Sequence, residues 1–306
     1  MAIKRVKMKL LVFKGGFEAE FCPGVNVLLG GNGTGKTTLM QTMYLDLKYR
    51  NDMKDPANIP EIDPIVLKNF FDIYSEKCII ESTETTHAVY MLEKDILEHA
   101  KGLLTFIEQK DTGFDLVYRD VLVSAQDIPT KHKSETQQYI GRIISDLIGG
   151  EVERNSGDGS FYTLWKDGTH IPFSNEASGY KKLGFLGLLV ASGQLEPGSI
   201  LFWDEPENSL NPDIVPVLVD ILLTLSRNGV QIFLATHDYN FARYFDVRKD
   251  KSVPVMYHNL SKTDDGRIVC ASSSEYVKLP GNLLEKAGAE LFNAVVADAM
   301  ENQKNE

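Results

Sequence analysis

The residues with the clearest chemistry lie at 30–37, where the chain reads Gly-Gly-Asn-Gly-Thr-Gly-Lys-Thr and fits the pattern GxxxxGK[ST]. Glycines at this spacing let backbone N–H groups curl around phosphate oxygens, and a following helix directs its positive end at them. Lys36 would place its charge on the β- and γ-phosphates, and the Thr37 hydroxyl would ligate Mg²⁺. We therefore expect ATP and Mg²⁺ to bind here, contacting Asn32, Gly33, Thr34, Gly35, Lys36, Thr37 and Thr38.

Two acidic residues end an apolar run at 200–205, which reads Ile-Leu-Phe-Trp-Asp-Glu. A continuous apolar run is typical of a strand that is buried on both faces, and open α/β sheets bind ligands at the carboxyl ends of such strands. We expect Asp204 to hold Mg²⁺, directly or through water. Glu205 would act as the general base that polarises the attacking water.

A histidine follows another apolar run, in Phe-Leu-Ala-Thr-His-Asp at 233–238. His237 comes 33 residues after Asp204, across one predicted helix, which favours a functional role over a structural one. A histidine in that place can contact a γ-phosphate and respond to its loss. Together with Lys36 and Glu205, His237 completes the predicted catalytic set.

Alternating helices and strands must position these side chains. The apolar run 25–29 predicts a buried strand that leads directly into the glycine-rich loop, and the pattern after Lys36 predicts a helix to about residue 48. Further strands are predicted at 199–203 and 230–235, and helices at 213–227 and 238–245. This alternation is typical of an α/β fold.

The rest of the chain is less regular. Glycines at 15 and 16 separate two predicted antiparallel strands, and Ser134 could cap an amphipathic helix that ends at Gly149. The remaining expected elements are strands at 3–13, 17–21, 86–92, 103–109, 114–123, 253–257 and 267–272, a turn at 110–113, and helices at 64–76, 134–148, 179–192 and 281–300.

Composition narrows the class of protein. The chain has 306 residues, is 43% hydrophobic and 25% charged, and has a net charge of −11. These values suit a globular protein, and no apolar stretch is long enough for a transmembrane helix or reads as a signal peptide, so we expect no membrane partner and a cytoplasmic location. The charge does not indicate nucleic-acid binding, although a local patch or a partner could supply a basic face. Three widely spaced cysteines suggest neither zinc nor a disulfide framework.

The order of phosphate loop, acidic strand and histidine resembles the ABC-type ATPases. The segment 176–182, Glu-Ala-Ser-Gly-Tyr-Lys-Lys, looks like a degenerate form of the Leu-Ser-Gly-Gly-Gln signature. Aligning Gly179 with the second glycine puts Ala177 at the place of the family's serine, with Ser178 one residue late. The resemblance implies that Ser178 and Gly179 contact a nucleotide, that 209–212 is the loop touching a partner subunit, and that Gln126 is the nucleotide-sensing glutamine.

The residues after the acidic strand narrow the resemblance further. Asp204-Glu205-Pro206-Glu207-Asn208 departs from the Asp-Glu-Pro-Thr or Asp-Glu-Ala-Thr typical of transporters and looks like the RecF/SMC/OLD-like branch. The resemblance implies an α/β P-loop NTPase fold, an ABC-ATPase head with a mixed central sheet, an N-terminal antiparallel β part and a helical lobe. We expect a single domain over 1–306, with a nucleotide-binding lobe at about 1–50 plus 193–306 and a β/helical lobe carrying the signature at about 51–192.

The resemblance also implies a function. We expect an ATPase that forms an ATP-dependent homodimer or higher oligomer and acts as a nucleotide switch for a separate effector protein, in anti-phage defence or DNA repair. No long coiled coil is present, and no nuclease domain is expected after the core. Two alternatives stay open. One is the nucleotide-binding subunit of a membrane transporter, disfavoured by Glu207, the degenerate signature and a β-rich 78–123. The other is a DNA-binding repair ATPase, which would use the cations Arg5, Lys7, Lys9, Lys131, Lys133, Lys181 and Lys182.

Overall fold

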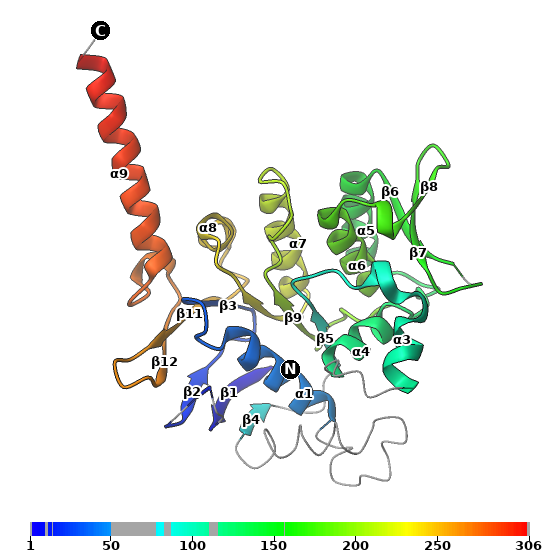
Figure 1. Cartoon of the computed structure of the whole chain (residues 1–306), viewed down its shortest axis with the longest axis horizontal. Coiled ribbons are helices and arrows are strands. Elements are labelled where there is room, and N and C mark those ends of the chain that lie inside the picture. The colour runs from blue at the N-terminus through cyan, green and yellow to red at the C-terminus, as the bar shows by residue number, and fades with distance from the viewer. Residues whose placement is uncertain are drawn as a thin grey trace.

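A six-stranded sheet forms the centre of the computed structural model, which describes residues 2–9, 12–13, 15–49, 78–82, 87–109, 116–155 and 157–304 (Figure 1). The strands lie in the order β12-β11-β3-β10-β9-β5. All neighbouring pairs are parallel except β11 with β12, so the predicted mixed sheet is confirmed. The strands are β3 (Val25–Leu29), β5 (Ala88–Met91), β9 (Ile200–Asp204), β10 (Gln231–Ala235), β11 (Val255–Lys262) and β12 (Ile268–Ser273).

The three central strands are apolar because both of their faces are covered. Every residue of β3, β9 and β10 is buried. Such strands cannot show an alternating pattern, which is why their sequences read as continuous apolar runs. Since these strands are parallel, the loops that follow all three meet at one edge of the sheet.

Helices connect the central strands, and they follow the prediction closely. α1 (Lys36–Tyr49) follows β3, α7 (Val215–Arg227) follows the loop after β9, and α8 (Tyr239–Arg248) follows β10. In Figure 1 α1 lies apart from α7 and α8, so helices flank the sheet from different sides. The helix start at Lys36 sets the phosphate loop between a rigid strand and a rigid helix.

A separate antiparallel sheet is formed near the N-terminus. Its strands are β1 (Ile3–Met8), β2 (Phe17–Glu20) and β4 (Cys78–Ser82), in the order β2-β1-β4. The predicted N-terminal antiparallel part is therefore confirmed. Two cations on β1 are paired with one carboxylate, because Arg5 and Lys7 both form ion pairs with Glu18.

Two strand predictions in the middle of the chain are wrong. Residues 103–109 lie in helix α3 (Ala100–Gln109), and residues 116–123 lie in helix α4 (Leu116–Ser124). Their β-branched and aromatic residues favour strands, but tertiary packing decided otherwise. α4 buries Leu116, Val117, Asp120 and Val121, a spacing typical of one helical face. The predicted turn at 110–113 and the predicted helix at 64–76 lie outside the described residues.

The segment before β9 forms a compact group of helices around a small sheet. α5 (Glu135–Ile148) begins where predicted: Ser134 accepts a hydrogen bond from the N–H of Gln137, whose side chain accepts one from the Ser134 N–H, and Gly149 ends the helix in the left-handed region. A three-stranded antiparallel sheet follows, and α6 (Ser178–Ala191) packs against α5. The strands are β6 (Gly150–Arg154), β7 (Phe161–Trp165) and β8 (His170–Pro172).

The residues assigned to the second lobe also contribute to the nucleotide-binding part. β5 pairs with β9 in the central sheet, and β4 pairs with β1. A buried carboxylate joins the two parts as well, because Tyr44 and Tyr49 of α1 both donate hydrogen bonds to Asp120 of α4. The two lobes are therefore interlocked.

The last helix, α9 (Leu283–Lys304), extends away from the other elements (Figure 1). It contacts α8, where Gly288 lies close to the ring of Tyr239. Among the described residues, no helix is both long and apolar enough to cross a membrane. Several large apolar side chains of α9 are exposed: Leu283, Leu291, Phe292, Val295 and Met300.

Candidate active site

Three of the four glycines in the loop 30–35 stand where another residue would be strained, namely Gly30, Gly33 and Gly35. Gly33 and Gly35 have φ angles of +74° and +84°, in the left-handed region that favours glycine. A β-carbon on Gly30 would lie 2.1 Å from the carbonyl oxygen of Leu260. The hydroxyl of Thr34 donates to the carbonyl of Gly31 at 2.9 Å and closes the loop. Asn32, Gly33 and Thr37 are exposed on its rim.

Lys36 begins α1 and folds back across this loop. Its ammonium group donates hydrogen bonds to the carbonyls of Gly30 at 2.8 Å and Gly31 at 3.3 Å. Burial lowers the pKa of Lys36, while the charges of Asp204 and Glu205 oppose that shift. The positive charge is therefore held at the centre of the loop, where it would meet phosphate oxygens.

Thr37 and Asp204 bring two oxygen ligands together from different elements. The Thr37 hydroxyl donates to Oδ2 of Asp204 at 2.6 Å. Burial raises the pKa of Asp204, and Thr37 partly offsets this. Hydroxyl and carboxylate oxygens are ligands that suit Mg²⁺, which keeps waters and substrate phosphates as its other ligands. In the part of the chain that the structure describes, no group of three His, Cys, Asp or Glu residues could hold a metal by itself.

Glu205 has a backbone conformation that is unusual for its residue type. Its φ angle is +46°, and its carbonyl accepts a hydrogen bond from the ammonium group of Lys182 at 2.8 Å. Its N–H donates to the carbonyl of Ala235 at 2.9 Å. A left-handed glutamate is strained, and strain of this kind gathers at functional sites where neighbouring contacts hold it.

His237 lies beside this carboxylate. Its Nε2 is 3.7 Å from Oε1 of Glu205, and the two side chains are 37% and 27% exposed, so water reaches both. Burial and the charge of Lys36 lower the pKa of His237 below its usual value, with Glu205 opposing. The imidazole is therefore neutral near pH 7 and has one N–H to donate.

The signature segment forms the start of α6. Ala177 precedes the helix and makes no side-chain cap, Ser178 is exposed, and Gly179 is buried. A β-carbon on Gly179 would lie 2.6 Å from the carbonyl oxygen of Ser209, so this glycine packs against the loop after β9. The signature and the segment 209–212 therefore meet within one chain.

This combination of fold and site agrees with comparison to known proteins. Residues 86–243 match the family described as "AAA domain, putative AbiEii toxin, Type IV TA system", which is just over half of the 306 residues. The chain belongs to this AAA family. The family supports ATP hydrolysis, so the chain is an ATPase, as its sequence predicts.

Individual relatives agree with this family at low identity. A putative ABC transporter ATP-binding protein of Clostridium perfringens is 24% identical over 269 residues, which cover 87% of this chain and 74% of the relative. An SMC head bound to the C-winged helix domain of ScpA has a TM-score of 0.52 at 13% identity and covers 90% of this chain and 99% of its own. An SMC head with an extended coiled coil, bound to the C-terminal domain of ScpA derived from Pyrococcus furiosus, has a TM-score of 0.50 at 13% identity, with coverages of 95% and 99%. These likenesses confirm the fold.

Gln126 of this AAA protein follows a helix and not the predicted strand. The choice of Gln126 relied on a strand at 114–123, and that segment is helix α4. Its side chain accepts a hydrogen bond from Arg154 of β6 at 3.3 Å. The strand on which this assignment relied is therefore a helix, and the nucleotide-sensing role of Gln126 stays a prediction.

Glu93 is a site residue that sequence reasoning missed. It follows β5, the strand beside β9, and its Oε1 accepts a hydrogen bond from Asn208 at 3.2 Å. Its charge helps to raise the pKa of Asp204 and opposes the lowering of the His237 pKa. The strand was predicted at 86–92, but only the sheet order shows that it ends beside Asp204.

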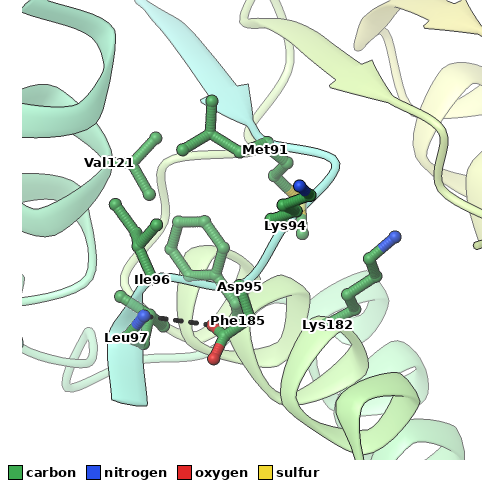
Figure 2. Close-up of a pocket in the computed structure, with 9 residues that line it drawn as sticks. Met91, Lys94, Asp95, Ile96, Leu97, Val121, Lys182 and Phe185 are labelled. Atoms are coloured by element: carbon green, nitrogen blue, oxygen red, sulfur yellow. Dashed lines mark hydrogen bonds between the residues drawn. The ribbon is translucent and has the colours of Figure 1, made fainter. Parts of the chain in front are cut away.

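Lys182 and Glu207 were also missed as site residues. Figure 2 shows Lys182 on α6 beside the segment 91–97, where a cavity of about 10 Å³ has room for roughly one water molecule. Burial lowers the pKa of Lys182, and the carboxylates of Glu207, Glu93, Glu205 and Asp204 oppose this. The sequence does contain Lys182 in the predicted signature and Glu207 as a third acid after β9. It does not show that these two residues lie close to each other in the folded chain.

Proposed function

We propose that this ATPase is a nucleotide switch in which two copies pair head to tail around ATP and Mg²⁺ and thereby control a separate effector protein. Its setting would be the cytoplasm, in anti-phage defence or DNA repair. Hydrolysis would release the pair, because a ligand shifts a conformational equilibrium only while it binds one state better. The chain's own residues supply each step.

One observation carries the proposal. Ser178 is exposed at the start of α6, and its hydroxyl makes no hydrogen bond within the described residues. The exposed N-terminus of a helix attracts anions. An exposed signature beside the segment 209–212 is suited to the phosphates of a second copy, and a two-fold pair would complete both sites at once.

The chemistry follows from the residues of one chain. Thr37 and Asp204 would hold Mg²⁺, which would supply positive charge to the phosphates of ATP. Lys36 adds a positive charge beside them. Glu205 is partly exposed and can take a proton from a water molecule, and neutral His237 can donate its N–H to the γ-phosphate.

Pairing is tested by mass. We expect Glu205→Gln, which keeps ATP bound, to double its mass by light scattering in ATP-Mg²⁺ and to stay single in ADP-Mg²⁺. A second variant, Ser178→Glu, suits the helix dipole but repels phosphate, so it should fold normally and fail to pair. Equal mass in ATP and ADP would overturn the pairing.

A matched control separates this repulsion from a general effect of charge. Ser274→Glu makes the same substitution at an exposed residue after β12. β12 runs antiparallel to β11, so its end lies at the opposite edge of the sheet from the phosphate loop. Ser274→Glu in the Glu205→Gln background should pair as well as Glu205→Gln alone.

A partner protein is supported by a structural neighbour, whose SMC head binds the C-winged helix domain of ScpA. The transporter alternative is favoured by the Clostridium perfringens relative, named a putative ABC transporter ATP-binding protein. The β-rich character of 78–123 no longer counts against a transporter subunit, because 103–109 and 116–123 are helical. Isolating the native complex distinguishes the two: a membrane-embedded partner supports the transporter subunit, and any other partner supports the switch.

Direct DNA binding is less well supported by this structure. Two of the cations that suggested it, Arg5 and Lys7 of β1, are both paired with Glu18. A carboxylate beside these cations weakens their attraction for phosphate. Duplex DNA that stimulates ATP hydrolysis in a salt-dependent way would nevertheless support the DNA-binding alternative.

A further inference from the structure

The loops that follow β9 and β10 are joined by a partly buried hydrogen bond. The hydroxyl of Thr236 donates to Oε1 of Glu207 at 2.5 Å and accepts from the N–H of Asp238 at 2.9 Å. Thr236 is fully buried, and Glu207 is largely buried. One threonine hydroxyl therefore connects the segment after the general base with both sides of His237.

The backbone around His237 is fixed by these contacts. Thr236 donates its N–H to the carbonyl of Leu28 at 3.1 Å, and the Asp238 carboxylate caps α8 by accepting from the N–H of Phe241 at 2.6 Å. His237 is thus the one residue between two anchored neighbours. Its imidazole faces Glu205, so a shift of Thr236 would move His237 relative to that carboxylate.

Glu207 also begins a loop that reaches the signature. The carbonyl of Glu207 accepts a hydrogen bond from the N–H of Leu210 at 3.1 Å, and Ser209 has a φ angle of +67°. Gly179 packs directly on the carbonyl of Ser209. The loop 207–210 therefore has His237 at one end, through Thr236, and the start of α6 at the other.

Burial and two neighbouring carboxylates oppose the ionisation of Glu207. Burial is the main reason that the pKa of Glu207 rises, to about 7, and the carboxylates of Asp238 and Glu205 add to it. Lys182 of α6 is the cation that interacts with it. One oxygen, Oε2, is buried and has no hydrogen-bond partner.

We propose that Glu207 is a positioning residue that sets His237 against Glu205 according to the conformation of the loop 207–210. The inference rests on the proposed switch for its purpose, since that loop would face the second copy. Contact of a partner with the loop would then change the position of His237 through Glu207 and Thr236. Glu207 touches neither nucleotide nor water in this mechanism.

The test compares variants that remove the hydrogen bond with variants that keep it. Glu207→Ala and the isosteric Thr236→Val remove it, while Glu207→Gln and Thr236→Ser retain an acceptor and a donor. We expect kcat for ATP to fall by roughly ten- to a hundredfold in the first pair, with KM changed less than about twofold, because misplacement of a reacting group acts on the chemical step. Glu207→Gln and Thr236→Ser should restore at least half of the parent kcat.

A double variant decides whether the two residues act together. If they do, Glu207→Ala/Thr236→Val should lose no more activity than the worse single variant. Losses that multiply, or a parent kcat in Glu207→Ala, would overturn the inference. Near-ultraviolet circular dichroism and ATP affinity by calorimetry establish that each variant is folded.

The same variants separate this inference from the pairing proposal. In the Glu205→Gln background, Glu207→Ala should still pair in ATP, because the phosphate contacts are intact. If no variant pairs but the kinetic pattern holds, Glu207 positions His237 within a single chain and the switch is wrong. If Glu205→Gln pairs but Glu207→Ala turns over at the parent rate, the switch stands and the positioning role is wrong.

Discussion

The imidazole of His237 lies 3.7 Å from the carboxylate of Glu205, although the two residues end different strands. The backbone of each residue is held by hydrogen bonds. Lys182 donates to the carbonyl of Glu205, and the neighbours of His237 are joined by the hydrogen bond from Asp238 to Thr236. The order of strands in the sheet therefore sets the predicted base and the predicted phosphate contact next to each other.

The first prediction concerns the general base. Glu205→Gln keeps the size and the hydrogen-bonding oxygen but cannot accept a proton, so turnover should fall by roughly 10²-fold or more. ATP affinity should change by less than about threefold. Phosphate release measures the first quantity and calorimetry the second. A variant that hydrolyses ATP at the parent rate would show that another group activates the water.

The second prediction concerns the charge inside the loop. Lys36→Ala removes hydrogen bonds from a charged donor, which are worth about 1.5–3 kcal/mol, so ATP affinity should weaken by roughly ten- to a hundredfold. Lys48→Ala is the matched control, because it lies in the last turn of the same helix and pairs with Asp120. Equal affinity in folded Lys36→Ala and in the parent would contradict the phosphate-loop assignment.

The third prediction compares Glu93, which the structure places in the site, with Gln126, the predicted nucleotide-sensing residue. Glu93→Ala should lower kcat by about tenfold or more, because the charge of Glu93 acts on both Asp204 and His237. Gln126→Ala should leave kcat within about twofold of the parent, since its contact is with Arg154. The opposite ranking would return the sensing role to Gln126.

The fourth prediction concerns stability and pH. The pKa of Glu207 is raised to about 7 from an ordinary value of 4.5, mainly by burial. Between these values the folded chain binds more protons than the unfolded chain, so the contribution of Glu207 to stability falls as pH rises through this window. Above pH 7 the ionised side chain would cost up to about 3 kcal/mol, reduced by whatever solvent reaches it.

Glu207→Gln removes that cost without removing the hydrogen-bond acceptor. Urea unfolding should therefore show the variant to be more stable than the parent at pH 8, with a difference that shrinks towards pH 5. Glu151→Gln, at an exposed residue of β6, provides the control for loss of a negative charge. A difference that is the same at both pH values would place the effect elsewhere than in ionisation of Glu207.

The parts of the site that could be predicted are those written in consecutive residues. The phosphate loop at 30–37 and the acids at 204–205 are motifs of eight residues or fewer, and each predicts its chemistry from the sequence alone. The adjoining strands are recognisable because both of their faces are buried and their residues are therefore apolar. The N-terminal cap at Ser134 is equally local, and it was predicted correctly. Local signals such as these depend little on how the rest of the chain folds.

The parts that could not be predicted depend on which elements become neighbours. Glu93 reaches the site because β5 pairs with β9 across more than a hundred residues of sequence. In segment 116–123, which was predicted as a strand, Asp120 is buried against Tyr44 and Tyr49 and so interrupts the apolar stripe that would indicate a helix. In a sequence, an aspartate predicts an exposed position, and its burial can be recognised only when its hydrogen-bond partners on another helix are known.

The contact between Gly179 and Ser209 has a consequence for mutational tolerance. Since a β-carbon at 179 would lie 2.6 Å from a backbone oxygen, every substitution there must first displace the loop after β9. Position 179 would remain intolerant of change even in a chain whose signature had lost all contact with nucleotide. In a saturation screen, depletion at 179 would thus measure folding, whereas depletion at the exposed position 178 would measure recognition of the second copy's phosphates.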